Sequence, residues 1–173
     1  MTDPRRPTDA TFTIDESRAV PTAVVRASDI TQDDVAPLFD AAFGAMFPAL
    51  AAVGQSPAGA PFALYPRAAD DWSRFDIEIG VPLHSPLADT IAAPTADGRN
   101  LAVEPSELPA GKVASTLHRG DYDGLGPAWR SFTDELVAAG HTPTLPRWEV
   151  YLTAPTPDSD PADASTGMNT RVE

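Results

Sequence analysis

The chain has 173 residues and a formal net charge of -13 at pH 7, from 25 Asp and Glu against 12 Lys and Arg. This length allows one domain with a sizeable core, and the negative charge argues against binding to nucleic acid or anionic membranes. Cysteine is absent, which excludes disulfides, thiolate metal sites and cysteine nucleophiles. We expect a cytoplasmic protein without a membrane span or signal peptide.

The first half of the chain predicts a strand, a helix and two further strands. Residues 1–17 are polar and predict a flexible lead-in. A strand is predicted over 20–27, followed by a helix that Thr31 can cap. Strands at 62–66 and 75–79 come next, the latter alternating apolar and acidic residues. The apolar stripe of the helix comprises Val35, Leu38, Phe39, Ala42, Met46 and Leu50, widened by Phe43 and Phe47.

The second half repeats this order after a connection rich in proline and glycine, at 82–100. A strand is predicted at 112–118, a helix at 125–139, and strands at 147–153 and 169–173. The apolar stripe of the second helix consists of Leu125, Trp129, Phe132 and Leu136.

Two copies of one unit predict an α+β fold in which duplicated strand-helix-strand-strand modules are related by a pseudo-twofold axis. The modules are expected at about 18–83 and 101–173. They would form an antiparallel curved sheet with two main helices and a central cleft. The loop at 154–167 is rich in Pro, Asp, Ser and Thr, which predicts a flexible excursion.

The strand predicted at 147–153 carries a carboxylate on one of its faces. Alternation places Glu149 and Tyr151 on one side and Trp148, Val150 and Leu152 on the other. The acidic face indicates a site, and the apolar face indicates core.

The first half has the same pattern without the acid. Tyr65 corresponds to Tyr151, whereas Ala63 stands where the second half has Glu149. A carboxylate that occurs once in a duplicated scaffold is not needed to build the scaffold. It therefore points to a site formed by one half.

Several short motifs occur in a fixed order. Leucine-proline with glycine lies at 108–111, a His-x-Gly-x-Tyr string at 118–122, a Glu-x-Tyr string at 149–151, and Gly-Val-Pro-Leu closes the first half at 80–83. Over residues 18–173 this order resembles the GyrI-like small-molecule-binding family. The same fold forms the effector-binding domain of several drug-responsive transcription activators. The stretch before Arg18 is too short for a helix-turn-helix, so we expect a stand-alone domain.

The resemblance implies an aromatic cleft between the halves with an acid at its floor, and Glu149 matches that acid. In such domains the carboxylate faces lipophilic cations, which shed their hydration cheaply and are attracted by aromatic faces. Ligand-binding candidates on this basis are Glu149, Tyr151, Tyr65, Tyr122, Trp72, Phe39, Phe43 and Met46. Alternatives stay open: Glu149 can be an exposed strand residue, and the tyrosines and the helix side chains can belong to the core.

Two functions follow from the resemblance. The first is a binding protein for aromatic, often cationic compounds. The second is a hydrolase of cyclopropanoid cyclohexadienone-type electrophiles, in which Glu149 activates water while Tyr151 or Tyr65 hydrogen-bonds the carbonyl oxygen. A protein-interaction module is a third possibility. His84, His118 and His141 lack metal-ligand spacing, and we predict neither metal nor cofactor.

Overall fold

The computed structural model describes residues 12–153, 160 and 163–173, which contain nine strands, two α-helices and two short 3-10 helices. In chain order the elements are β1 (Thr13–Ser17), β2 (Val20–Ile30), η1 (Gln32–Asp34), α1 (Val35–Ala52), β3 (Phe62–Ala68), β4 (Phe75–Pro82), β5 (Ile91–Pro94), β6 (Asn100–Leu108), β7 (Gly111–Arg119), η2 (Tyr122–Gly124), α2 (Leu125–Ala138), β8 (Pro143–Tyr151) and β9 (Ser165–Val172).

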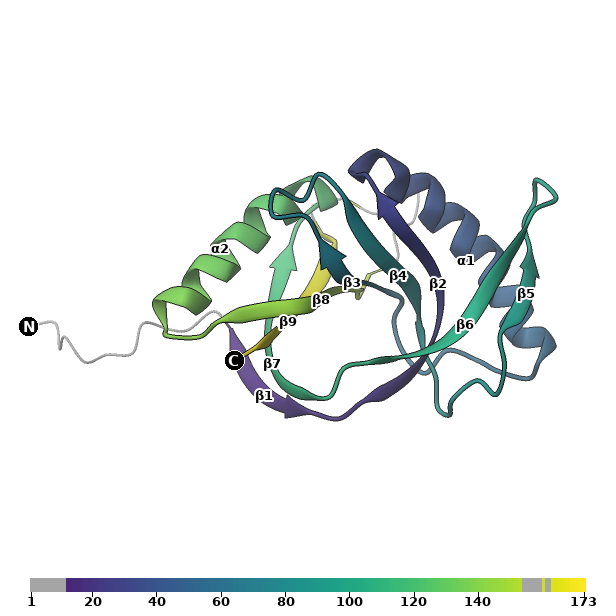
Figure 1. Cartoon of the computed structure of the whole chain (residues 1–173), viewed down its shortest axis with the longest axis horizontal. Helices are drawn as coiled ribbons and strands as arrows, with labels where there is room; N and C mark the ends of the chain where they lie inside the picture. The colour runs from purple at the N-terminus through teal and green to yellow at the C-terminus, as the bar shows by residue number, and fades with distance from the viewer. Residues whose placement is uncertain (1–11, 154–159, 161–162) are drawn as a thin grey trace, which may run out of the picture.

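The strands form one sheet in the order β1-β7-β9-β8-β3-β4-β2-β6-β5. Every described pair is antiparallel. Figure 1 shows the sheet strongly curved, with α2 over one half and α1 over the other. The predicted α+β fold is confirmed: β2, α1, β3 and β4 form the first module, and β7, α2, β8 and β9 form the second. Strands β3 and β8 join the modules.

The pseudo-twofold axis passes through one residue pair of the β3–β8 ladder. By position in the two modules, Phe62 corresponds to Trp148 and Leu64 corresponds to Val150. The ladder pairs them crosswise, Phe62 with Val150 and Leu64 with Trp148, as a twofold axis between them requires. Ala63 pairs directly with Glu149, its own counterpart in the other module. The single acid therefore lies at the axis, where both helices can approach it.

The two faces of the sheet bury different cores. On the helix side, α1 packs over the first module and α2 over the second. On the other side, Phe62, Leu64 and Trp148 form a separate buried cluster with partly buried Val150 packed against it. The predicted alternation is thus confirmed for Trp148 and Val150, but Leu152 lies beyond β8 and is 54% exposed.

Helix α1 is apolar around most of its surface. By length and composition alone, Gln32–Ala52, with a mean hydropathy of 1.5, is a candidate membrane span, contrary to the expectation that there is none. In the structure this helix packs against β4, β5 and β6. Its inner face is a core face, while Phe47 is 42% exposed. The buried residues of the helix are Ala42, Ala45, Met46 and Leu50.

Several predicted boundaries are corrected at the sheet margins. Thr13–Ser17 belongs to the predicted lead-in but forms β1 on β7, because Phe12 and Ile14 pack against the α2 core. The predicted connection at 82–100 contains β5, which pairs with β6. Ser165–Gly167 of the predicted excursion belong to β9; residues 1–11, 154–159 and 161–162 lie outside the described part of the chain.

Candidate ligand-binding site

Glu149 is the buried centre of the site. It lies on β8 and is 7% exposed. The indole Nε1 of Trp129 donates a hydrogen bond of 2.8 Å to its Oε1, and the Tyr151 hydroxyl donates one of 2.8 Å to its Oε2. Hydrogen bonds to a charged group contribute about 1.5–3 kcal/mol each. The two donors thus hold a carboxylate in an otherwise aromatic setting.

Arg147 lies on the same face of β8, two residues before the acid. Its guanidinium carbon is 3.6 Å from the centroid of the Trp72 ring and 4.2 Å from that of Trp129, so the cation lies against two indoles. Burial lowers the pKa of Arg147 to about 10, against the opposing influence of Glu149 and Tyr65. Arg147 is therefore protonated at neutral pH.

Trp72 is delivered by the hairpin between β3 and β4. The turn is closed by hydrogen bonds from the Ala69 amide to the Arg74 carbonyl and from the Trp72 amide to the Ala69 carbonyl. Trp72 has a φ of 59°, a left-handed conformation that is unfavourable for a bulky residue. Its ring lies 5.6 Å from Tyr65. The turn thus holds the indole over the centre of the sheet.

A row of aromatic rings leads from Tyr151 along α1. Centroid distances are 5.5 Å from Tyr151 to Phe39, 5.7 Å from Phe39 to Phe43 and 5.8 Å from Phe43 to Phe47. On the other side of Tyr151, the ring of Tyr122 lies 5.7 Å away and is 45% exposed. The row connects the buried acid to the solvent-exposed surface.

A pocket of about 250 Å³ adjoins Arg147. The β3–β4 hairpin, α2 and the start of β8 supply most of its wall, so it lies between the two modules. Its lining residues are Ala68, Ala69, Asp70, Trp72, Trp129, Thr133, Pro143, Thr144, Leu145, Arg147 and Thr170.

A family model described as a GyrI-like small molecule binding domain matches residues 19–167. The chain belongs to the GyrI-like family. The resemblance inferred from the sequence motifs is thereby confirmed.

Solved structures share the fold of this GyrI-like domain. The C-terminal domain of EcmrR has a TM-score of 0.70 at 16% identity, with 94% of this chain and 96% of that chain covered. EcmrR in complex with DNA has a TM-score of 0.68 at 16% identity, with 94% of this chain and 57% of that longer chain covered.

Two further structures are similar to the GyrI-like domain. A hydrolase from Listeria innocua has a TM-score of 0.60 at 9% identity, with 95% of this chain and 92% of that chain covered. SAV2435 bound to tetraphenylphosphonium has a TM-score of 0.57 at 10% identity, with 94% of this chain and 93% of that chain covered. No curated protein matches the chain in sequence.

The structure brings most of the predicted residues of the GyrI-like domain together. Glu149 and Tyr151 are hydrogen-bonded. Ring contacts join Tyr122, Phe39 and Phe43 to Tyr151. Tyr65 and Trp72 form a second group, which contacts Arg147 through the Trp72 ring. Of the predicted ligand-binding residues, Trp72 alone is among the lining residues of the described pocket. Met46 is fully buried in the core beneath α1.

Two residues of the site escaped sequence reasoning. The sequence pattern places Trp129 only in the buried stripe of its helix and indicates no role for Arg147. Phe39 lies four residues after Val35, which begins α1, and Trp129 lies four residues after Leu125, which begins α2. Comparison of the two modules would therefore have linked Trp129 to the site, and strand alternation places Arg147 on the face of Glu149.

Buried Tyr65 and partly buried Tyr151 predict a loss of stability in alkaline solution. Burial and the nearby Glu149 carboxylate raise the pKa of both Tyr65 and Tyr151 above the ordinary value. Since the folded state retains these protons more tightly, the stability they contribute is complete below about pH 10 and is lost as the pH rises further.

We expect tyrosinate absorbance from these two residues to appear only together with loss of the native circular dichroism. Tyr65→Phe and Tyr151→Phe variants assign the signal. Tyrosinate from either residue in a fully folded chain would contradict the expectation.

Proposed function

We propose that this GyrI-like domain is a cytoplasmic protein that binds aromatic, lipophilic cations between its two modules. The observation that carries the proposal is the buried carboxylate of Glu149 at the pseudo-twofold axis, surrounded by aromatic side chains. An aromatic cation offers both attractions that such a site can supply, namely charge and ring faces. Because its charge is delocalised, it also sheds hydration water at little cost.

Two further observations support a cationic ligand. The formal net charge of -13 favours accumulation of cations near the protein. SAV2435, which shares the fold, is bound to tetraphenylphosphonium. The aromatic row from exposed Phe47 through half-buried Phe43 and Phe39 offers ring surface on which a ligand can move towards Tyr151.

The decisive experiment compares Glu149→Gln with the wild type in binding tetraphenylphosphonium and triphenylphosphine oxide. The two compounds share their phenyl rings, but only the first is charged. We expect the variant to bind the cation at least tenfold more weakly, a difference of about 1.4 kcal/mol, and to bind the neutral oxide almost unchanged. The amide retains the size of the side chain and an acceptor for Trp129 Nε1.

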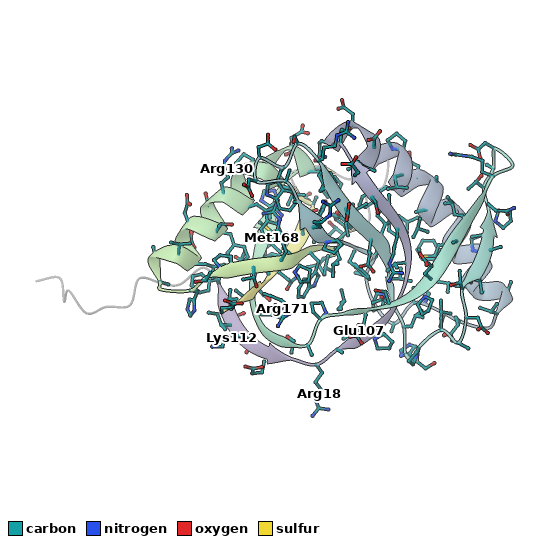
Figure 2. The ribbon with its side chains drawn as sticks, in the orientation of Figure 1. Arg18, Glu107, Lys112, Arg130, Met168 and Arg171 are labelled. Atoms are coloured by element: carbon teal, nitrogen blue, oxygen red, sulfur yellow. The ribbon has the colours of Figure 1, made fainter. Side chains whose placement is uncertain are left out.

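Glu107→Gln is the matched control. Glu107 is an exposed carboxylate on β6 and lies on the side of the view away from α2 (Figure 2). Its removal changes the net charge by the same amount without touching the site. Equal cation affinity in the wild type and Glu149→Gln would refute the proposal, as would equal weakening by both substitutions.

Hydrolysis of a strained electrophile is the second candidate function, and the contact between Glu149 and Tyr151 favours it. A carboxylate can activate water while a neutral phenol stabilises a developing oxyanion. The phenol of Tyr151 stays protonated because its pKa is raised, but its hydroxyl already donates to Glu149 Oε2. Mass spectrometry after incubation with a cyclopropanoid cyclohexadienone tests this candidate: addition of one water in the wild type, and none in Glu149→Gln, would establish turnover.

A further inference from the structure

In the GyrI-like domain, the aromatic side chains that could bind a cationic ligand are in contact with a cationic side chain of the protein itself. The Arg147 guanidinium lies against Trp72 and Trp129, with centroid distances of 3.6 and 4.2 Å. Trp129 is also the residue that donates to Glu149. A planar cation against two indoles beside a buried carboxylate has the same chemistry as the ligand proposed above.

We propose that Arg147 is an internal competitor of cationic ligands, and that a lipophilic cation enters the space between Trp72 and Trp129 only when the guanidinium leaves it. This inference rests on the proposed function and names the residue that sets its selectivity. While Arg147 is in place, it satisfies both indole faces and opposes the approach of a second positive charge. The arginine therefore lowers the observed affinity of cationic ligands, and only cations that bind the indoles strongly displace it.

Few polar contacts hold the Arg147 guanidinium against the two indoles. Its Nε is buried, and no hydrogen-bond partner for it occurs among the described residues. Within the same ranges, no carboxylate oxygen lies within 4.0 Å of its nitrogens. Desolvation, which lowers the pKa of the group, is a cost that release would remove. Stacking on the two indoles and the attraction of the nearby Glu149 charge thus hold the side chain, without a hydrogen bond to Nε.

The neighbouring pocket has room for the displaced guanidinium of Arg147. Arg147 lines this pocket of about 250 Å³, and so does Asp70, an exposed carboxylate on the β3–β4 hairpin. A side chain that swings from the indoles into the pocket approaches this carboxylate and the solvent. Trp72 belongs to the same hairpin, so movement of the hairpin would open the stack from one side.

The test measures tetraphenylphosphonium affinity of the wild type and Arg147→Met by calorimetry. Methionine keeps an unbranched side chain that packs between rings, but it carries no charge. We expect the variant to bind at least tenfold more tightly, because the charge repulsion disappears and a neutral thioether competes for the indole faces less strongly than a guanidinium does. Adding Glu149→Gln to Arg147→Met should abolish most of this gain.

Arg130→Met is the matched control. Arg130 lies on the exposed side of α2 and is labelled in Figure 2. Its replacement removes the same charge from the helix that carries Trp129 but leaves the stack intact, so its affinity should match that of the wild type. Equal gains in Arg130→Met and Arg147→Met would overturn the inference, because the effect would then come from net charge alone.

A second measurement, by NMR spectroscopy, follows the Arg147 side chain in the wild-type protein. In the free wild type, indole ring currents should shift the side-chain Nε–H resonance of Arg147 away from those of the other arginines. Triple-resonance spectra of the wild type assign this resonance through the backbone of Arg147. Saturation with tetraphenylphosphonium should return it towards the ordinary position. A shifted resonance that persists in the saturated complex would overturn the inference even if Arg147→Met failed to fold.

The outcomes separate this inference from the proposed function. Glu149-dependent binding that is equal or weaker in Arg147→Met would overturn the role of Arg147 and leave the proposed function standing. Absence of tetraphenylphosphonium binding in both folded proteins would overturn both proposals. Binding that is detectable only in Arg147→Met, and is lost with Glu149→Gln, would support the internal competitor.

Discussion

Replacing Trp129 with alanine is expected to lower the free energy of unfolding by about 3–5 kcal/mol, the usual cost of truncating a buried tryptophan. The side chain is 4% exposed and packs against Phe132 with a centroid distance of 5.7 Å. Its loss also removes the donor to Glu149 Oε1 and one of the two rings against Arg147. Two charged groups would then lie beside a cavity with fewer partners.

The measurement is equilibrium unfolding in urea, with Trp129→Phe as the control. Phenylalanine restores most of the ring surface but cannot donate a hydrogen bond to Glu149. We therefore expect an intermediate loss of about 1.5–3 kcal/mol, as for a hydrogen bond to a charged group. If Trp129→Phe were as stable as the wild type, the indole N–H would contribute nothing to holding the carboxylate.

Replacing Gly80 with alanine is expected to destabilise the GyrI-like domain by about 3 kcal/mol or more, at the upper end of the cost of overpacking. Gly80 lies in β4, between β2 and β3. A Cβ atom there would overlap the carbonyl oxygen of Ala23 and approach Val24 Cγ1 to 2.8 Å. Relief would require the backbones of β2 and β4 to separate.

Gly126→Ala provides the matched control for this substitution. Gly126 lies in α2, and a Cβ atom there would have no neighbour within 4 Å. Alanine in a helix is favoured over glycine by roughly 1 kcal/mol, so this variant should be as stable as the wild type or more stable. A Gly80→Ala melting temperature equal to that of the wild type would show that β2 and β4 can separate without cost.

The functional asymmetry of the GyrI-like domain arises on a symmetric scaffold. At the axis, Glu149 faces Ala63, and two residues earlier on the same strand Arg147 pairs with Tyr65. Both charges belong to β8, and β3 offers only uncharged side chains at the paired positions. The proposed ligand would therefore meet both charges of the paired strands on the second module.

Local patterns in the sequence predicted the elements with strong periodicity. The alternation over 75–79 and the apolar stripe of the second helix correspond to β4 and α2. Strand β1 and the β5–β6 hairpin were missed because their own patterns are weak, and prolines lie within both strands of the hairpin. They are held by pairing with distant segments, as between Thr13–Ser17 and β7. Such pairing overrides local propensity.

The sequence by itself determined that Glu149 and Tyr151 share a strand face, because side chains alternate along any strand. It also determined that the acid occurs in one module alone. Only the tertiary structure decided that Trp129 donates to this acid and that Arg147 lies between Trp72 and Trp129. These contacts join a hairpin, a helix and a strand that are far apart in the chain, and no local period encodes which distant side chains will meet across the axis.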